Sequence, residues 1–119
     1  MTMTARTISI SIDRPYAEVY RFLAEPDNFS RWASGMDATA ELTTTPPNEF
    51  GVLDHTVHLP DGQNVYVPMR TVHNGAGTEV LFTVFRLPDM DDAAFAADAE
   101  AVLKDLRVLK GLLESGLGD

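Results

Sequence analysis

The chain has 119 residues, of which 45% are hydrophobic and 23% are charged, and this composition is typical of one globular domain. Its formal net charge of -9 argues against a nucleic acid as partner, because binding to phosphates requires a basic face. The absence of cysteine excludes disulfides, thiolate metal ligands and a cysteine nucleophile.

Membrane insertion and secretion have no support in the sequence. There is no run of about 18 apolar residues, which a membrane span would need. Residues 1–7 lack the apolar stretch of a secretion signal. We therefore expect a cytoplasmic protein without a membrane span.

The first elements are a strand and a helix. Residues 7–12 alternate isoleucine with threonine or serine, as a half-buried strand requires. The period then becomes helical, and the residues of its apolar stripe are Tyr16, Val19, Tyr20 and Leu23. Pro15 can open this helix in its first turn, and Asp13 can cap it or supply a negative charge there.

A second, shorter helix is predicted directly afterwards. Pro26 ends the first helix, and Asp27 or Asn28 can cap the next one. Phe29 and Trp32 then lie on the apolar side of the short helix. The predicted order is strand, helix and short helix ending in tryptophan.

This opening resembles that of the START-like and polyketide-cyclase (SRPBCC) superfamily. The residues that carry the resemblance are Ile10, Ile12, Pro15, Val19, Tyr20, Leu23, Pro26, Phe29 and Trp32. They are packing residues, so the motif specifies a fold much better than an activity. The resemblance implies an α+β helix-grip fold, in which a curved antiparallel sheet packs on a long C-terminal helix and two small helices follow the first strand.

The middle of the chain predicts an antiparallel meander. A weak strand candidate at residues 38–44 is followed by a loop at Pro46-Pro47. Three stronger strands are predicted at residues 52–59, 64–73 and 78–86. Short turns at residues 60–62 and 74–75 join them, which requires antiparallel neighbours.

A long helix is predicted for residues 91–113. Its apolar stripe consists of Phe95, Ala99, Val102, Leu106, Leu109 and Leu113, and must pack on the sheet. The acidic side chains of this last part of the chain are interpreted as a helix N-terminus and a solvated helix face. They are Asp89, Asp91, Asp92, Asp98, Glu100, Asp105, Glu114 and Asp119.

The resemblance thus covers residues 1–119 as one domain, with one departure. Typical members of the superfamily are longer and have one hairpin more than the five strands predicted here. The missing hairpin leaves open whether a cavity between sheet and helix is closed.

A metal site and a serine nucleophile are not predicted. His55 and His58 are three residues apart on a predicted strand, so their side chains leave opposite faces. His73 is the remaining histidine. No Gly-x-Ser-x-Gly elbow and no glycine-rich phosphate loop are present, and no cofactor is expected.

Several strand and helix residues are candidates for lining a pocket beneath the long helix. The candidate ligand-binding residues are Trp32, His55, Tyr66, Met69, Arg70 and Phe85, with Thr71, His73 and Thr83 as further polar candidates. A hydrogen-bonded core histidine is the favoured interpretation of His55 over a catalytic one. Trp32, Met69 and Phe85 are interpreted first as core residues, and Arg70 as a solvated strand residue. Because Pro68 removes a ladder donor and suggests an edge position or a bulge, the faces of Met69 and Arg70 are not assigned.

Three functions are compatible with these residues. The favoured one is binding of a small hydrophobic or amphipathic molecule between the sheet and the C-terminal helix. An enzyme similar to polyketide cyclases and dehydratases would need His55 and Arg70 in one cavity. An interaction module without a ligand would use exposed apolar surface to bind a partner or a second copy of itself.

Overall fold

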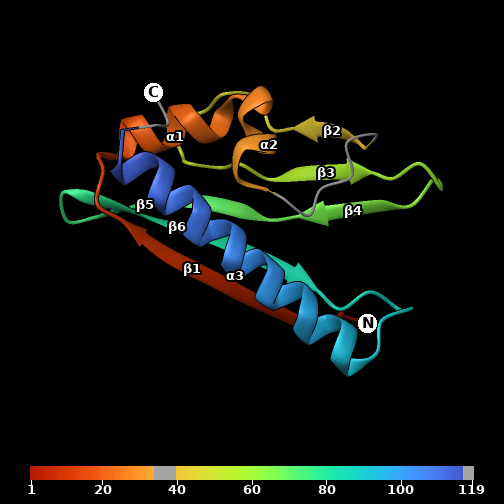
Figure 1. Ribbon diagram of the computed structural model, residues 1–119. Helices are drawn as coiled ribbons and strands as arrows, with labels where there is room; N and C mark the ends of the chain where they lie inside the picture. The colour runs from red at the N-terminus through yellow and green to blue at the C-terminus, as the bar shows by residue number, and fades with distance from the viewer. Residues whose placement is uncertain (34–39, 117–119) are drawn as a thin grey trace.

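The computed structural model describes residues 1–33 and 40–116. Within them, an α+β fold is formed by antiparallel strands, short helices after the first strand and a long C-terminal helix, which confirms the predicted fold class (Figure 1). The helices are α1 (Tyr16–Ala24), the 3-10 turn η1 (Pro26–Asn28), α2 (Phe29–Trp32) and α3 (Asp92–Glu114). The strands are β1 (Ala5–Ile12), β2 (Glu41–Thr44), β3 (His55–His58), β4 (Asn64–Val67), β5 (Met69–Asn74) and β6 (Gly77–Phe85).

The strands form two antiparallel sheets among the described residues, in the orders β1-β6-β5 and β2-β3-β4. The predicted strand at residues 64–73 is wrong in one respect, because Pro68 divides it into β4 and β5, one in each sheet. Proline offers no N–H to a ladder, which is why pairing changes at this residue. Of the predicted strand at residues 38–44, positions 38 and 39 lie outside the described residues, and β2 begins at Glu41.

The caps of the first helices also differ from the prediction. Pro15 is the N-cap of α1, whose first turn has no capping side chain. Asp13 does not cap α1 through its side chain. Its backbone N–H donates to the Glu114 carboxylate of α3, 2.8 Å away. Neither Asp27 nor Asn28 caps the second helix through its side chain, and the bond at this turn runs from the N–H of Asp27 to the carboxylate of Glu25.

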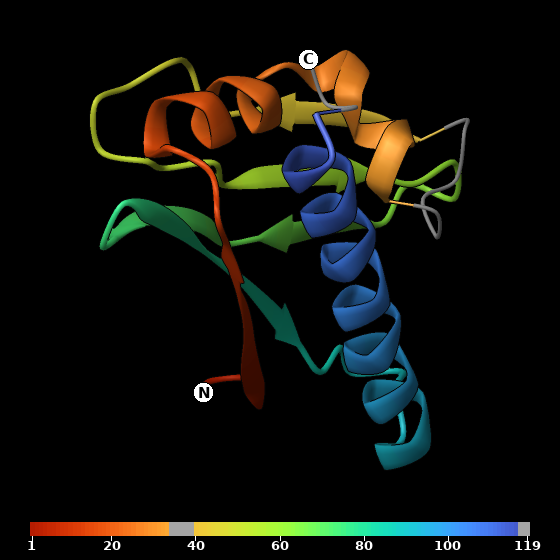
Figure 2. The same ribbon diagram turned by 60° about the vertical axis from the view of Figure 1, so that its left-hand side comes forward.

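The two sheets are joined where the chain before β3 runs beside β5. The N–H of Leu53 donates to the Met69 carbonyl at 2.8 Å, and the N–H of Thr71 donates to the Gly51 carbonyl at 2.9 Å. Beyond Pro68, whose carbonyl accepts from the N–H of Thr83, β4 turns away from β6 (Figure 2). The two sheets are therefore joined beside β5, and they separate between β4 and β6.

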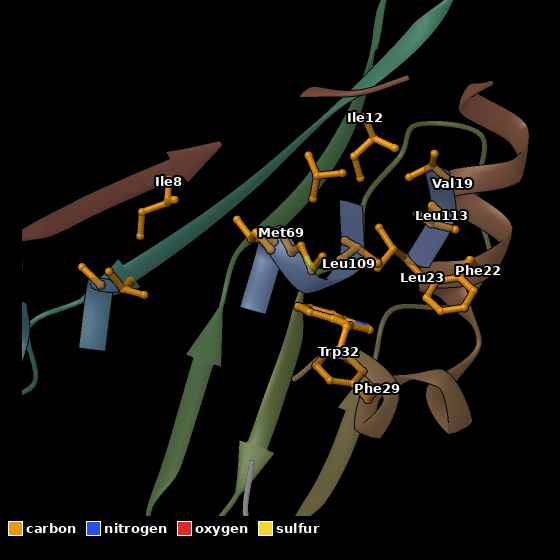
Figure 3. Close-up of a cluster of buried hydrophobic side chains, with 14 residues drawn as sticks. Ile8, Ile12, Val19, Phe22, Leu23, Phe29, Trp32, Met69, Leu109 and Leu113 are labelled. Atoms are coloured by element: carbon orange, nitrogen blue, oxygen red, sulfur yellow. The ribbon is translucent and has the colours of Figure 1, made fainter. Parts of the chain in front are cut away.

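The core lies between β1, β5, β6 and the helices. Leu106, Leu109 and Leu113 of α3 are at most 1% exposed and pack with residues of α1 and α2, while Phe29 and Trp32 lie beside Leu109 in Figure 3. Phe95 and Val102 of the predicted stripe are only partly buried. The C-terminal half of α3 thus completes the core, and its N-terminal half borders open space. In the described part of the chain, no helix combines the length and the apolar character needed to cross a bilayer.

Candidate functional site

A cavity of about 500 Å³ lies between residues of β4, β6 and the N-terminal half of α3. Its walls are Leu59, Gln63, Val65, Tyr66, Val67, Phe82, Thr83, Val84, Phe85, Leu87, Asp89, Met90, Ala94, Asp98 and Val102. Four consecutive residues of β6 contribute, although neighbouring side chains of a strand point to opposite faces. The cavity therefore extends across the edge of β6 that β4 leaves unpaired.

A second cavity of about 190 Å³ lies next to the first along α3. Its walls are Phe29, Trp32, Ala33, His55, Val57, Val67, Phe82, Asp98, Val102 and Asp105. Val67, Phe82, Asp98 and Val102 line both cavities. The two cavities are therefore neighbours along α3, and we call them together the α3 groove, which is lined mainly by apolar and aromatic side chains.

His55 is the most deeply buried polar side chain of the α3 groove, with 3% of its surface exposed. Its ring lies edge-on to Phe29, with centroids 4.9 Å apart. Nδ1 is 3.1 Å from the Leu53 carbonyl oxygen, which can only accept, so Nδ1 carries the proton and Nε2 a lone pair. Burial lowers the pKa of His55 and outweighs the opposing effects of this bond and of Asp54, so the imidazole is neutral at pH 7.

Asp98 lines both cavities and is only partly exposed, so it is not the fully solvated position that the sequence interpretation expected. No described residue donates a hydrogen bond to its carboxylate or pairs with it. Burial raises the pKa of Asp98, because the charged form loses hydration. The sequence spacing could have indicated this position. Asp98 follows Phe95 by three residues and precedes Val102 by four, which places it on the apolar stripe of the helix.

Four of the six predicted ligand-binding residues line the α3 groove. Trp32 and His55 line the second cavity, whereas Tyr66 and Phe85 line the first. Met69 is 2% exposed and borders, with His55, a space of only about 10 Å³. That volume is barely enough for one water molecule, so Met69 is a packing residue.

Arg70 lines neither cavity of the α3 groove. Its guanidinium lies 2.7 Å from the carboxylate of Asp54, which also accepts from the Tyr66 hydroxyl at 2.5 Å. Burial opposes ionisation of Asp54, but the bonds from Tyr66, the Met69 N–H and Arg70 together lower its pKa. The bond to Asp54 raises the pKa of Tyr66. The catalytic pairing of His55 with Arg70 is therefore not formed.

The other polar candidates have structural partners. Thr71 donates to the Gly51 carbonyl at 3.3 Å. Thr83 lines the first cavity and shares a hydrogen bond with Thr7 across β1 and β6, at 2.8 Å. His73 stacks on Tyr16, with ring centroids 4.2 Å apart.

The three histidines occupy separate surroundings. His58 lies between Thr43 Oγ1, at 2.6 Å, and Asn64 Oδ1, at 2.8 Å, whereas His55 is in the core and His73 stacks on Tyr16. Within residues 1–33 and 40–116, no three histidine or acidic side chains gather closely enough to hold a metal ion.

Comparison with known proteins shows a fold and no closer relationship. No family model and no curated protein matches the chain. A protein of Cytophaga hutchinsonii with a solution structure has a TM-score of 0.75 at 16% identity, covering 100% of this chain and 99% of that one.

Two further solved structures share the fold. The Aha1 dimer from Colwellia psychrerythraea has a TM-score of 0.63 at 16% identity, covering 94% of this chain and 97% of that one. DynU16, a protein in the dynemicin biosynthetic locus, has a TM-score of 0.66 at 15% identity, covering 94% of this chain and 48% of that one. At such identities the likeness shows the fold alone, and it is consistent with the START-like (SRPBCC) type that the opening residues predict.

Proposed function

We propose that the protein binds a small hydrophobic or amphipathic molecule in the α3 groove. The observation that carries the proposal is the pair of neighbouring cavities with mainly apolar walls, which share Val67, Phe82, Asp98 and Val102. A volume of about 500 Å³ in the first cavity alone suits a drug-sized ligand. Binding sites of this kind typically combine apolar walls with a few polar groups, as here.

The proposal does not require a reaction. His55 is the one predicted proton-transfer group in the groove, and the other predicted member of the pair, Arg70, is held by Asp54 outside it. Fold likeness to DynU16 and the Aha1 dimer supports the architecture, and the activity must be argued from the groove itself. A cytoplasmic location stays a prediction.

A variant that fills the groove tests the proposal. Val102 lines both cavities, and the larger side chain of Val102→Phe would occupy the space between them. The probe is N-phenyl-1-naphthylamine, an uncharged aromatic molecule that fluoresces when it leaves water. We expect the wild-type protein to bind it and Val102→Phe to weaken binding about tenfold or more, the effect of losing roughly 1.4 kcal/mol.

The matched control is Val108→Phe, since Val108 lies on the same helix, is 42% exposed and lines neither cavity. This variant should bind the probe as the wild type does. Equal binding by Val102→Phe and the wild type would contradict the proposal, as would the absence of binding to the wild type.

Self-association is a second candidate function. Phe50, Tyr66 and Val72 are exposed by 79%, 52% and 46%, which leaves apolar surface for a second copy. One solved structure with this fold is a dimer in solution, the Aha1 protein of Colwellia psychrerythraea. Light scattering over a range of concentrations tests this candidate, and a constant monomer mass would remove it.

A further inference from the structure

We infer that the ligand of the α3 groove carries a protonated amine, which Asp98 binds while apolar parts of the molecule fill the two cavities. The inference rests on the proposed function and adds the chemical class of the ligand. It follows from the charge of the groove, from its hydrogen-bonding groups and from its aromatic walls.

The charged side chains of the groove are all acidic. Asp89 and Asp98 line the first cavity, and Asp98 and Asp105 line the second, whereas no described lysine or arginine lines either. The imidazole of His55 adds no positive charge, because it is neutral at pH 7. An anionic ligand such as a fatty acid would therefore meet only repulsion, while a cation would be attracted.

His55, Asp98 and Asp105 bring acceptors to the second cavity, and the indole N–H of Trp32 is a donor among its walls. His55 donates from Nδ1 to Leu53, so Nε2 can only accept. Among the described residues no fully buried side-chain nitrogen or oxygen lacks a partner, and no bond to Nε2 is formed, so Nε2 keeps some accessible surface on a residue that lines the second cavity. The Asp98 carboxylate is an acceptor as well. A ligand that bonds to these two acceptors must supply donors, and an ammonium group supplies up to three.

Aromatic faces complete the surroundings of a cation. The rings of Phe29 and Trp32 are 5.0 Å apart, and those of His55 and Phe82 are 6.1 Å apart. Phe29, Trp32 and Phe82 line the second cavity together with Asp98. Ammonium groups are attracted to such faces, most strongly where water is excluded.

Asp98 is the residue that distinguishes this proposal from simple apolar binding. It borders both cavities, so an amine bound to it leaves apolar space on either side. No described lysine or arginine pairs with the partly buried Asp98 carboxylate, so its charged form is unfavourable. A bound ammonium group would offset the lost hydration.

Calorimetric titration of the full chain at pH 7.5 with three matched probes tests the inference. The probes are 4-phenylbutylamine, 4-phenylbutan-1-ol and 4-phenylbutanoate, which share one apolar part. We expect the amine to bind about tenfold more tightly than the alcohol, as a hydrogen-bonded charge allows, and the carboxylate to bind most weakly.

Three variants assign the preference to Asp98. Asp98→Asn should weaken amine binding about tenfold and alcohol binding by much less, since the alcohol loses no charge interaction, while Asp98→Glu should keep the amine preference. Glu100→Gln removes the same charge from an exposed position of α3 and should change neither. Amide spectra by NMR show whether each variant is folded.

Equal affinity of the wild type for amine and alcohol would overturn the inference and leave the proposed function standing. The inference would also fall if Glu100→Gln weakened amine binding as much as Asp98→Asn, because the preference would then reflect net charge. Loss of the preference in Asp98→Glu would likewise contradict it. If neither amine nor alcohol binds, both proposals are wrong.

Discussion

The carboxylate of Asp54 accepts a hydrogen bond from the backbone N–H of Met69, with Oδ1 and nitrogen 2.8 Å apart. This bond stands at the junction of the two sheets, directly after Pro68, where the regular ladder is interrupted. The same carboxylate binds Tyr66 and Arg70. A side chain thus replaces the backbone partner that the interrupted ladder does not provide, and it fixes the point from which β4 and β6 separate.

Replacement of Asp54 by asparagine should destabilise the protein in a pH-dependent way. Because the folded-state pKa of Asp54 is lowered, its stabilisation is present above the ordinary carboxyl pKa of 3.8 and is lost as pH falls through the folded-state value. We expect Asp54→Asn to lower the free energy of unfolding by about 2 kcal/mol at pH 7, with a smaller difference from the wild type below about pH 4.

Urea unfolding at several pH values measures this difference. Glu49→Gln, at an exposed loop position near by in the sequence, is the control and should have almost no effect. A difference between Asp54→Asn and the wild type that does not change with pH would contradict the assignment.

Replacement of Gly51 by alanine should be strongly destabilising. Gly51 has φ +71°, and a Cβ there would overlap the Thr71 carbonyl oxygen and lie 2.6 Å from the Tyr16 hydroxyl oxygen. We expect a loss of about 3 kcal/mol, part from the backbone strain and the rest from overlap. Gly62 is the matched control, because its φ is +89° and a Cβ would meet nothing within 4 Å. Gly62→Ala should cost only about 1 kcal/mol in thermal or urea unfolding, and equal losses would contradict the steric explanation.

The fluorescence of Trp32 should report binding in the second cavity. Trp32 is the single tryptophan and is 3% exposed, so the free protein should emit at the short wavelength of a buried indole. Titration with 4-phenylbutan-1-ol should change the intensity in the wild type and in Val108→Phe, and much less in Val102→Phe, since only the last variant fills the groove. An unchanged signal in the wild type, with binding seen by calorimetry, would place the probe elsewhere.

Asp98→Asn should stabilise the free protein, in contrast to Asp54→Asn. A carboxyl whose folded-state pKa is raised by burial loses stability as pH rises through the interval between its unfolded and folded values. At pH 7 the charged form is penalised, so removing the charge should raise the free energy of unfolding by about 0.5 kcal/mol, a small gain because Asp98 is partly exposed.

Urea unfolding at pH 7 and pH 3.5 checks the sign, with Glu100→Gln as control. The gain of Asp98→Asn should be present at pH 7 and absent at pH 3.5, where the wild-type carboxyl is already protonated. A loss of stability at pH 7 would mean that Asp98 has a structural role rather than an unfavourable free charge. Higher stability together with weaker amine binding would be typical of a ligand-binding residue.

The hydrophobic periodicity of the sequence by itself determined the first strand and the last helix and which of their residues face the core. Alternation in residues 7–12 and the spacing of Leu106, Leu109 and Leu113 depend only on strand and helix geometry, and the structure buries Ile8, Ile12 and these leucines accordingly. The α+β fold class was instead implied by the resemblance of the opening residues to the START-like superfamily.

Only the tertiary structure decided where the groove lies and which polar groups face it. The sequence suggested an edge position or a bulge at Pro68. The division into two strands and the divergence of β4 from β6 depend on segments far apart in the chain, as does the ion pair of Arg70 with Asp54. As an acidic residue Asp98 suggests a solvated helix face, whereas its spacing from Phe95 and Val102 places it on the apolar stripe. The sequence pattern alone does not decide which of the two surroundings it has. Periodicity specifies which side of an element faces inward, whereas the neighbours assembled around that side determine whether it meets packed core or open space.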